Sequence, residues 1–272
     1  MADADPALKR RILSAVILAP AVLALEILGT WSFALLLAAG AVLLAMEWRH
    51  LIAARVDQRA GDVAGFAAGV IALAVIVVAA AGFAESALLL ALIAAAAAGL
   101  LAHVISASPF WTWLGVLYFS IPLLALVWLR ALPDIGLLTI LWLFLVVWTT
   151  DIMAYVAGRS FGGPKLAPSI SPGKTWSGLG GGMAGAAIIG GLMSLVMEPF
   201  DLLPSIVLAL GLAVVAQIGD LAESSLKRKA GVKDSGGLIP GHGGLFDRID
   251  GLLFAAPVLA VVMMLAGRQS LS

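Results

Sequence analysis

The sequence predicts an all-α polytopic integral membrane protein with about nine transmembrane helices. Of its 272 residues, 62% are hydrophobic and only 12% are charged, and the mean hydropathy is +1.10. This composition is too apolar for a water-soluble globular domain. A membrane helix needs about 20 mostly apolar residues, so the chain has room for about eight to ten spans if its loops are short. Little of it remains for a separate soluble domain.

Nine apolar stretches predict the individual helices. They cover residues 12–28, 31–48, 63–83, 86–105, 114–130, 135–157, 178–198, 203–220 and 249–267. The fourth and fifth are separated by Pro109 and the aromatic residues that follow it, a composition typical of an interfacial turn. We divide the chain into an N-terminal transmembrane region, residues 1–130, and a C-terminal transmembrane region, residues 131–272.

The Lys and Arg residues indicate the orientation, because cytoplasmic loops carry an excess of them. With nine spans and a cytoplasmic N-terminus, only Arg130 and Arg268 of the 16 Lys and Arg residues fall outside. The C-terminus is then expected outside. We expect the first helix to be retained rather than cleaved as a signal peptide, because its apolar run continues past the small residues Ala19 and Ala21.

Two compositional features exclude whole classes of function. The formal net charge is zero, so no basic or acidic field indicates a nucleic acid partner. The chain contains no cysteine, which excludes disulfides, thiolate metal sites and cysteine nucleophiles.

Ionisable residues interrupt several predicted spans, where each costs about 2.5–3.5 kcal/mol on insertion scales and usually marks a functional position. In the sixth span, Asp151 lies four residues before Tyr155 and eight before Arg159. The three therefore share one helical face near the cytoplasmic end of the span.

The eighth and ninth spans meet the cytoplasm at acidic residues. Asp220 and Glu223 end the eighth span, Lys227 continues the same helical face, and Asp247 and Asp250 open the ninth. If Asp151, Asp220, Glu223 and Asp250 all faced lipid, they would together cost roughly 10 kcal/mol, so they must point to one another, to cations or to water. One alternative is simple ion pairing between helices, and another is an ion path through a transporter. A transporter would spread polar residues across the bilayer depth, whereas here they gather at one end.

The first long cytoplasmic segment, residues 158–177, combines the components of a phosphate-binding loop. Glycines give it flexibility, Ser171 and Thr175 supply hydroxyls, and Arg159 and Lys174 supply positive charge. It is not a P-loop, because Pro168 stands where that motif requires glycine and no strand is expected before it. The glycines that follow, from Gly178 to Gly185, have the alternative explanation that they allow close helix packing.

The second cytoplasmic segment, residues 221–248, mixes carboxylates with cations around a Gly-His-Gly-Gly turn. One interpretation is a polybasic stretch that attracts anionic lipid headgroups. The interleaved Asp234 and Asp247 would weaken that attraction. Carboxylates that hold Mg²⁺ beside Lys and Arg that hold phosphate oxygens explain the composition better.

The segment from Ser224 to Asp250 is similar to the signature motif of phosphatidate cytidylyltransferases, also called CDP-diglyceride synthases. The stretch from Asp151 to Arg159 and the Ser-Pro-Gly-Lys-Thr-Trp run also resemble this family. One position departs from the pattern: Ser177 stands where family members commonly have an acidic residue. The residues that carry the signature are Ser224, Leu226, Lys227, Arg228, Lys233, Asp234, Gly236, Ile239, Pro240, His242, Gly243, Gly244, Leu245, Asp247, Arg248, Ile249 and Asp250.

The resemblance implies a Mg²⁺-dependent nucleotidyltransferase of phospholipid biosynthesis that converts CTP and phosphatidic acid to CDP-diacylglycerol and pyrophosphate. It further implies a bacterial cytoplasmic (inner) membrane location, an active site that faces the cytoplasm, and a possible homodimer. The alternative is CTP-dependent activation of another lipid phosphate, such as an isoprenoid or ether lipid. The sequence leaves this alternative open, because no motif indicates which lipid tail the protein binds.

The resemblance also suggests a role for each polar residue of the C-terminal half. We expect the metal ligands to be Asp220, Glu223, Asp247 and Asp250. The expected catalytic residues are Lys227, Asp247 and Asp220. The expected substrate-binding residues are Asp151, Tyr155, Arg159, Ser171, Lys174, Thr175, Arg228, Lys233, Asp234, His242 and Arg248.

Overall fold

The computed structural model describes residues 20–195, 201–236 and 243–267. The chain divides into two compact units, which we treat separately. The first comprises Met1–Ala131, Lys229–Arg248 and Leu271–Ser272, and the second comprises Leu132–Arg228 and Ile249–Ser270. The described residues 229–236 and 243–248, which lie in the C-terminal half of the sequence, thus cluster with the N-terminal helices.

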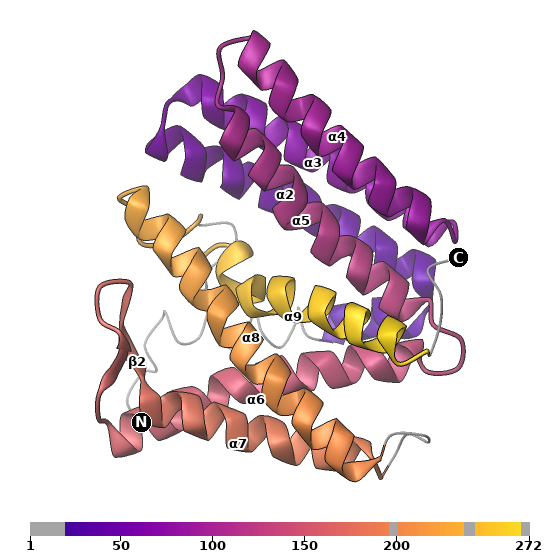
Figure 1. Cartoon of the computed structure of the whole chain (residues 1–272), viewed down its shortest axis with the longest axis vertical. Coiled ribbons are helices and arrows are strands. Elements are labelled where there is room, and N and C mark those ends of the chain that lie inside the picture. The colour runs from indigo at the N-terminus through magenta and orange to yellow at the C-terminus, as the bar shows by residue number, and fades with distance from the viewer. Residues whose placement is uncertain (1–19, 196–200, 237–242, 268–272) are drawn as a thin grey trace, which may run out of the picture. The chain divides into compact units, whose positions relative to one another are not determined.

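The first unit is a bundle of long helices that lie side by side (Figure 1). Helix α3 packs against α2, α4 and α5, and α5 also packs against α2 and α4. The buried face of α3 is built from small residues such as Ala60, Ala64, Ala68 and Ala72, which let neighbouring helices approach closely. The bounds are Thr30–Arg55 for α2, Gln58–Ala80 for α3, Ala84–Val104 for α4 and Pro109–Arg130 for α5.

The second unit contains the remaining elements in chain order. They are α6 (Gly136–Phe161), the strands β1 (Lys165–Ala167) and β2 (Ser171–Thr175), α7 (Trp176–Met193), α8 (Leu202–Lys229) and α9 (Phe246–Leu265). Helix α9 begins in the first unit and belongs to the second from Ile249 onward.

Glycines allow α6 and α7 to pack closely. A Cβ atom at Gly178 would lie 2.9 Å from the carbonyl oxygen of Ala154, and one at Gly182 would lie 2.8 Å from that of Thr150. Gly180, by contrast, has nothing within 4 Å of its Cβ position. Close helix packing, considered above as the alternative to phosphate binding, thus accounts for Gly178 and Gly182.

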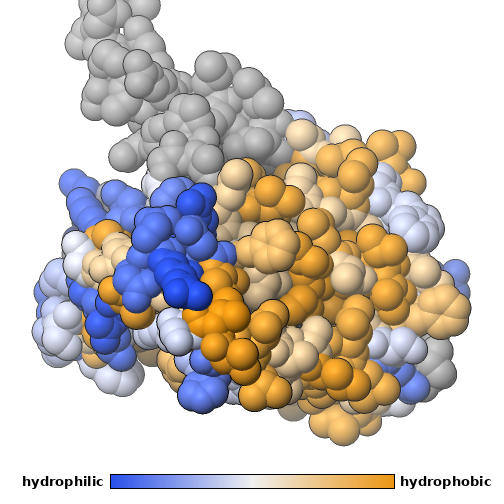
Figure 2. All heavy atoms as spheres, turned by 90° about the horizontal axis from the view of Figure 1, so that it is seen from above, coloured by the Kyte–Doolittle hydropathy of each residue, from blue (hydrophilic) through white to orange (hydrophobic). Residues whose placement is uncertain are grey.

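Many large apolar side chains are exposed, as expected for helices surrounded by lipid. The exposed fraction reaches 75% at Phe66 and 79% at Leu265. Figure 2 shows apolar side chains over much of the visible face. Seven of the described helices, namely α2 to α6, α8 and α9, are long and apolar enough to span a membrane.

The all-α polytopic class is confirmed, but the count of nine spans is not. Residues 12–19 of the first predicted span lie outside the described residues, and the 18-residue, glycine-rich α7 is not among the seven candidates. Two details differ from expectation. The segment 158–177 contains a short antiparallel hairpin, and α8 continues to Lys229, so residues 221–229 of the predicted cytoplasmic segment are helical.

A buried ion pair joins the C-terminal end of α5 to the helical residues 20–27 that precede α2. Arg130 Nε lies 3.0 Å from Glu26 Oε1, and the guanidinium also donates from Nη2 to the Glu26 carbonyl oxygen at 2.8 Å. The Glu26 side chain is fully buried and that of Arg130 is 13% exposed. The pair between Arg49 and Asp62, by contrast, is about half exposed.

We predict that Arg130→Ala lowers the free energy of unfolding by about 3 kcal/mol, because it leaves the Glu26 carboxylate buried without its cation. The matched control Arg49→Ala should cost less than about 1 kcal/mol, since exposed pairs contribute little. Unfolding by SDS in mixed micelles measures both values. Equal losses for the two variants would contradict the distinction between buried and exposed pairs.

Candidate active site

The site in the second unit depends on a close approach between α8 and α9. A Cβ atom at Gly219 of α8 would lie 2.6 Å from the carbonyl oxygen of Asp250 and 3.1 Å from Cβ of Phe254. On the α9 side, a Cβ at Gly251 would lie 3.2 Å from Cβ of Ala216. Glycine at these positions therefore lets the two backbones come together where both helices carry acidic residues.

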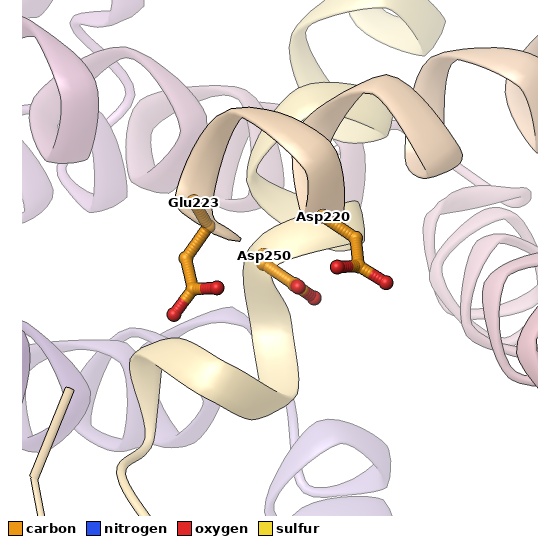
Figure 3. A group of neighbouring side chains, drawn as sticks. All are labelled: Asp220, Glu223 and Asp250. Carbon is orange, nitrogen blue, oxygen red and sulfur yellow. The ribbon is translucent and has the colours of Figure 1, made fainter. Parts of the chain in front are cut away.

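Three carboxylates meet at this contact. Asp220 and Glu223 of α8 and Asp250 of α9 each offer one oxygen atom, and the three oxygens lie within 4.8 Å of one another. Figure 3 shows Asp250 between the two side chains of α8. Glu223 and Asp250 are buried. Like charges so close in a medium of low dielectric constant repel strongly, so cations are required beside them.

Two lysines from different elements provide positive charge. Lys174 Nζ lies 2.6 Å from Asp220 Oδ2, and Lys227 Nζ, one turn further along α8, lies 2.7 Å from Glu223 Oε2. Both lysine side chains are mostly buried, with exposed fractions of 16% and 12%. Ser224 Oγ also donates to Asp220 Oδ1 at 3.3 Å. Alternating acidic and basic groups thus form one continuous polar cluster.

The hairpin holds Lys174 in this cluster. Strands β1 and β2 pair antiparallel, with Lys165 opposite Thr175 and Ala167 opposite Ser171. Where β2 ends, the Thr175 hydroxyl accepts a hydrogen bond from the backbone N–H of Gly178 at 3.0 Å and caps the N-terminus of α7. Lys174 is therefore next to a fixed helix terminus rather than within a flexible loop.

Further contacts tie the hairpin to its neighbours. The Ser177 hydroxyl donates to the carbonyl oxygen of Gly162, which follows the last residue of α6. Arg228 Nε, near the end of α8, donates to the carbonyl oxygen of Ile170 in the hairpin turn at 3.4 Å. Ser177, the position at which this sequence departs from the expected family pattern, thus has a structural contact here.

The predicted face of α6 makes two separate interactions. Arg159 Nη1 donates to the Tyr155 hydroxyl at 2.9 Å, whereas Asp151 Oδ1 accepts a hydrogen bond from Gln217 Nε2 of α8 at 3.2 Å. Asp151 therefore connects α6 to the helix that carries Asp220.

The other predicted site residues belong to the first unit or lie outside the described residues. Asp247 accepts hydrogen bonds from the backbone N–H groups of Gly244, at 3.0 Å, and Ser235, at 3.2 Å. Lys233, Asp234 and Arg248 are exposed there, and His242 lies outside the described residues. The predicted part of Asp247 in metal binding stays a prediction.

Sequence reasoning missed the buried Glu26 and also Glu47 of α2, which is buried as well. The Glu47 carboxylate accepts hydrogen bonds from the start of α9 and from Ser235. The sequence contains a signal for Glu47, because this residue lies inside the apolar stretch 31–48. The free-energy cost of placing a charged residue in a membrane span applies to Glu47 as it does to Asp151.

The donor set of the second unit fits a hard divalent cation. Asp220, Glu223 and Asp250 offer only oxygen ligands, as Mg²⁺ prefers, and Mg²⁺ is commonly held by a few carboxylates together with substrate phosphates. The neighbouring lysines suit phosphate oxygens. The fold and the site together define an integral membrane protein equipped for phosphate chemistry.

Comparison with known proteins agrees with this class. The model of the cytidylyltransferase family matches residues 9–266, so the chain belongs to this family. A phosphatidate cytidylyltransferase of Brucella abortus is 55% identical over 152 residues, which cover 55% of each chain. One from Bacillus subtilis is 43% identical over 138 residues, 50% of this chain and 51% of that protein. The chain spans about half the length of these two relatives.

A phosphatidate cytidylyltransferase of Rickettsia felis is covered more fully. It is 41% identical over 172 residues, which make up 56% of this chain and 75% of that protein.

The contact between α8 and α9 can be tested by two identical substitutions in one helix. We predict that Gly219→Ala lowers the free energy of unfolding by about 1–3 kcal/mol, because the added methyl group forces α9 away. Gly211→Ala, also in α8, should be neutral or slightly stabilising, since nothing lies within 4 Å of its Cβ position. SDS unfolding of both variants checks this, and a destabilised Gly211→Ala with an unaffected Gly219→Ala would refute it.

Proposed function

We propose that the protein is a Mg²⁺-dependent phosphatidate cytidylyltransferase, which converts CTP and phosphatidic acid to CDP-diacylglycerol and pyrophosphate. The observation that carries the proposal is the group of Asp220, Glu223 and Asp250 with two lysines bound to it, in a chain of the cytidylyltransferase family. The names of the relatives support phosphatidate as the lipid substrate. Family membership disfavours the transporter alternative.

Asp220, Glu223 and Asp250 are the residues that would hold the metal ion. Mg²⁺ bound there would neutralise charge on the phosphate oxygens of CTP. The ion pairs already present keep Lys174 and Lys227 beside these carboxylates.

In the proposed reaction, an oxygen of the phosphatidate phosphate attacks the α-phosphorus of CTP. A new P–O–P linkage forms, the bond between the α- and β-phosphates breaks, and pyrophosphate leaves. A phosphate monoester is largely ionised at neutral pH, so no side chain has to act as a strong general base. The work of the protein is then to orient two anionic substrates and to offset their repulsion, which Lys174 and Lys227 would do by binding phosphate oxygens.

The proposed location is the bacterial inner membrane, with the site facing the cytoplasm. The bacterial relatives and the bias of Lys and Arg toward one side support this orientation. A site near the ends of membrane helices suits a lipid substrate that arrives from the bilayer and a nucleotide that arrives from water. The homodimer implied by the resemblance stays a prediction.

The direct test is to incubate the purified protein with labelled CTP, Mg²⁺ and one lipid phosphate at a time. We expect CDP-diacylglycerol from phosphatidic acid, together with pyrophosphate. A product formed from a polyisoprenyl phosphate or an ether-linked phosphatidate instead would support the alternative lipid substrate. Absence of any CDP-lipid would contradict the enzyme proposal.

Two aspartates of the second unit provide matched variants for the same assay. Asp250→Asn should lower the turnover number about 10²–10³-fold, because it removes one carboxylate from the proposed metal site. Asp201→Asn, at an exposed aspartate just before α8, should retain wild-type turnover. Wild-type turnover by Asp250→Asn would remove this residue from the site.

A further inference from the structure

Glu47 is a buried carboxylate with an unusually complete set of hydrogen-bond donors. Oε1 accepts from the backbone N–H of Leu245 at 2.7 Å. Oε2 accepts from the backbone N–H of Phe246 at 2.8 Å and from the Ser235 hydroxyl at 2.9 Å. Glu47 is only 1% exposed. Burying a charge costs several kcal/mol unless hydrogen bonds compensate it, so these contacts are what allows an ionised group at this position.

The three groups that donate hydrogen bonds to Glu47 come from the two ends of the segment 235–246. Ser235 stands ten residues before Leu245, and Phe246 is the first residue of α9. The first N–H groups of a helix have no partner within the helix, and a negative charge there is favoured by the helix dipole. Glu47 thus caps α9 from a different helix and also holds Ser235.

The residues around the Glu47 side chain are tightly packed. A Cβ atom at Gly244 would lie 2.6 Å from Glu47 Oε2 and 2.1 Å from Ser235 Oγ, and one at Gly236 would lie 3.1 Å from Glu47 Cγ. Asp247 adds a second link, since it accepts hydrogen bonds from both Ser235 and Gly244. The two ends of the segment are therefore fixed against α2 and against each other.

Aromatic packing holds the same helix start. Trp48, the neighbour of Glu47, packs edge to face against Phe246 with ring centroids 6.4 Å apart. Phe246 is fully buried and also contacts Tyr118 and Phe119 of α5. The first turn of α9 is thus anchored by a polar and an apolar contact at adjacent residues of α2.

We propose that Glu47 is a positioning residue for CTP binding. Lys233 lies two residues before Ser235, and Arg248 lies two residues after Phe246, so the groups that contact Glu47 are close in sequence to two cations that are predicted to bind substrate. Lys and Arg side chains suit the phosphate oxygens of a nucleotide. Glu47 itself would touch no substrate. This inference rests on the proposed function, and it gives the N-terminal helices, which carry no signature residues, a part in the reaction.

The test compares Glu47→Gln with Glu85→Gln, a change at an exposed glutamate in the first turn of α4. Glutamine keeps the size of Glu47 but turns an N–H group toward the backbone N–H of either Leu245 or Phe246, whichever way the amide is oriented. We expect the KM for CTP to rise about tenfold or more in Glu47→Gln, with the KM for phosphatidate unchanged within about twofold. Glu85→Gln should match the wild type.

The split between the two KM values separates positioning from stability alone. A variant that merely unfolds more easily would lose maximal rate, because fewer molecules are active, while both KM values stay the same. That result would overturn the proposal, as would a Glu47→Gln enzyme with wild-type kinetics. If Glu47→Gln cannot be purified, Ser235→Ala removes one donor from the same carboxylate and should raise the KM for CTP in the same way, and a wild-type KM for CTP would overturn the proposal.

Amide hydrogen exchange gives a readout that does not depend on activity. Peptides covering 231–236 and 243–248 should exchange about tenfold faster in Glu47→Gln than in the wild type or Glu85→Gln. If the wild-type protein forms no CDP-lipid, the proposed function fails, and exchange together with calorimetric binding of CTP then decides the role of Glu47. Unchanged exchange, or unchanged CTP affinity with faster exchange, would overturn it.

Discussion

Electrostatic repulsion among three carboxylates is the constraint on which the candidate site depends. Asp220, Glu223 and Asp250 bring oxygen atoms within 4.8 Å of one another, which is unfavourable unless cations compensate. The second unit meets this requirement in two ways. Lys227 is supplied by α8 itself, and Lys174 is supplied by a hairpin whose end is fixed by the capping of α7. A divalent ion would complete the compensation, which is why the cluster fits metal and phosphate chemistry better than ion pairing alone.

Acidic residues other than these three also organise the polypeptide. Glu26 is held by Arg130, Asp151 by Gln217, and Glu47 by the start of α9. In each case a group that would be costly in lipid connects two segments distant in sequence. Several carboxylates of this protein therefore specify which segments lie together.

Hydropathy was sufficient to predict most of the fold, since a run of about 20 apolar residues has one stable conformation in a bilayer. It failed where polar residues continue a helix, as at the end of α8 up to Lys229, because hydropathy does not report hydrogen bonding beyond the span. The cost of placing charged residues in a membrane span singled out Asp220, Glu223 and Asp250, and the structure brings these three together. The hairpin that holds Lys174, and the contact between Glu47 and α9, depend on pairing between distant residues that a single sequence does not reveal.

The central claim is that Asp220, Glu223 and Asp250 together bind a divalent cation. Diffraction from crystals soaked in Mn²⁺, which substitutes for Mg²⁺ and gives an anomalous signal, tests it most directly. The account predicts an anomalous peak about 2.0–2.3 Å from oxygen atoms of these three residues. A peak elsewhere, or no peak in crystals that bind CTP, would contradict it.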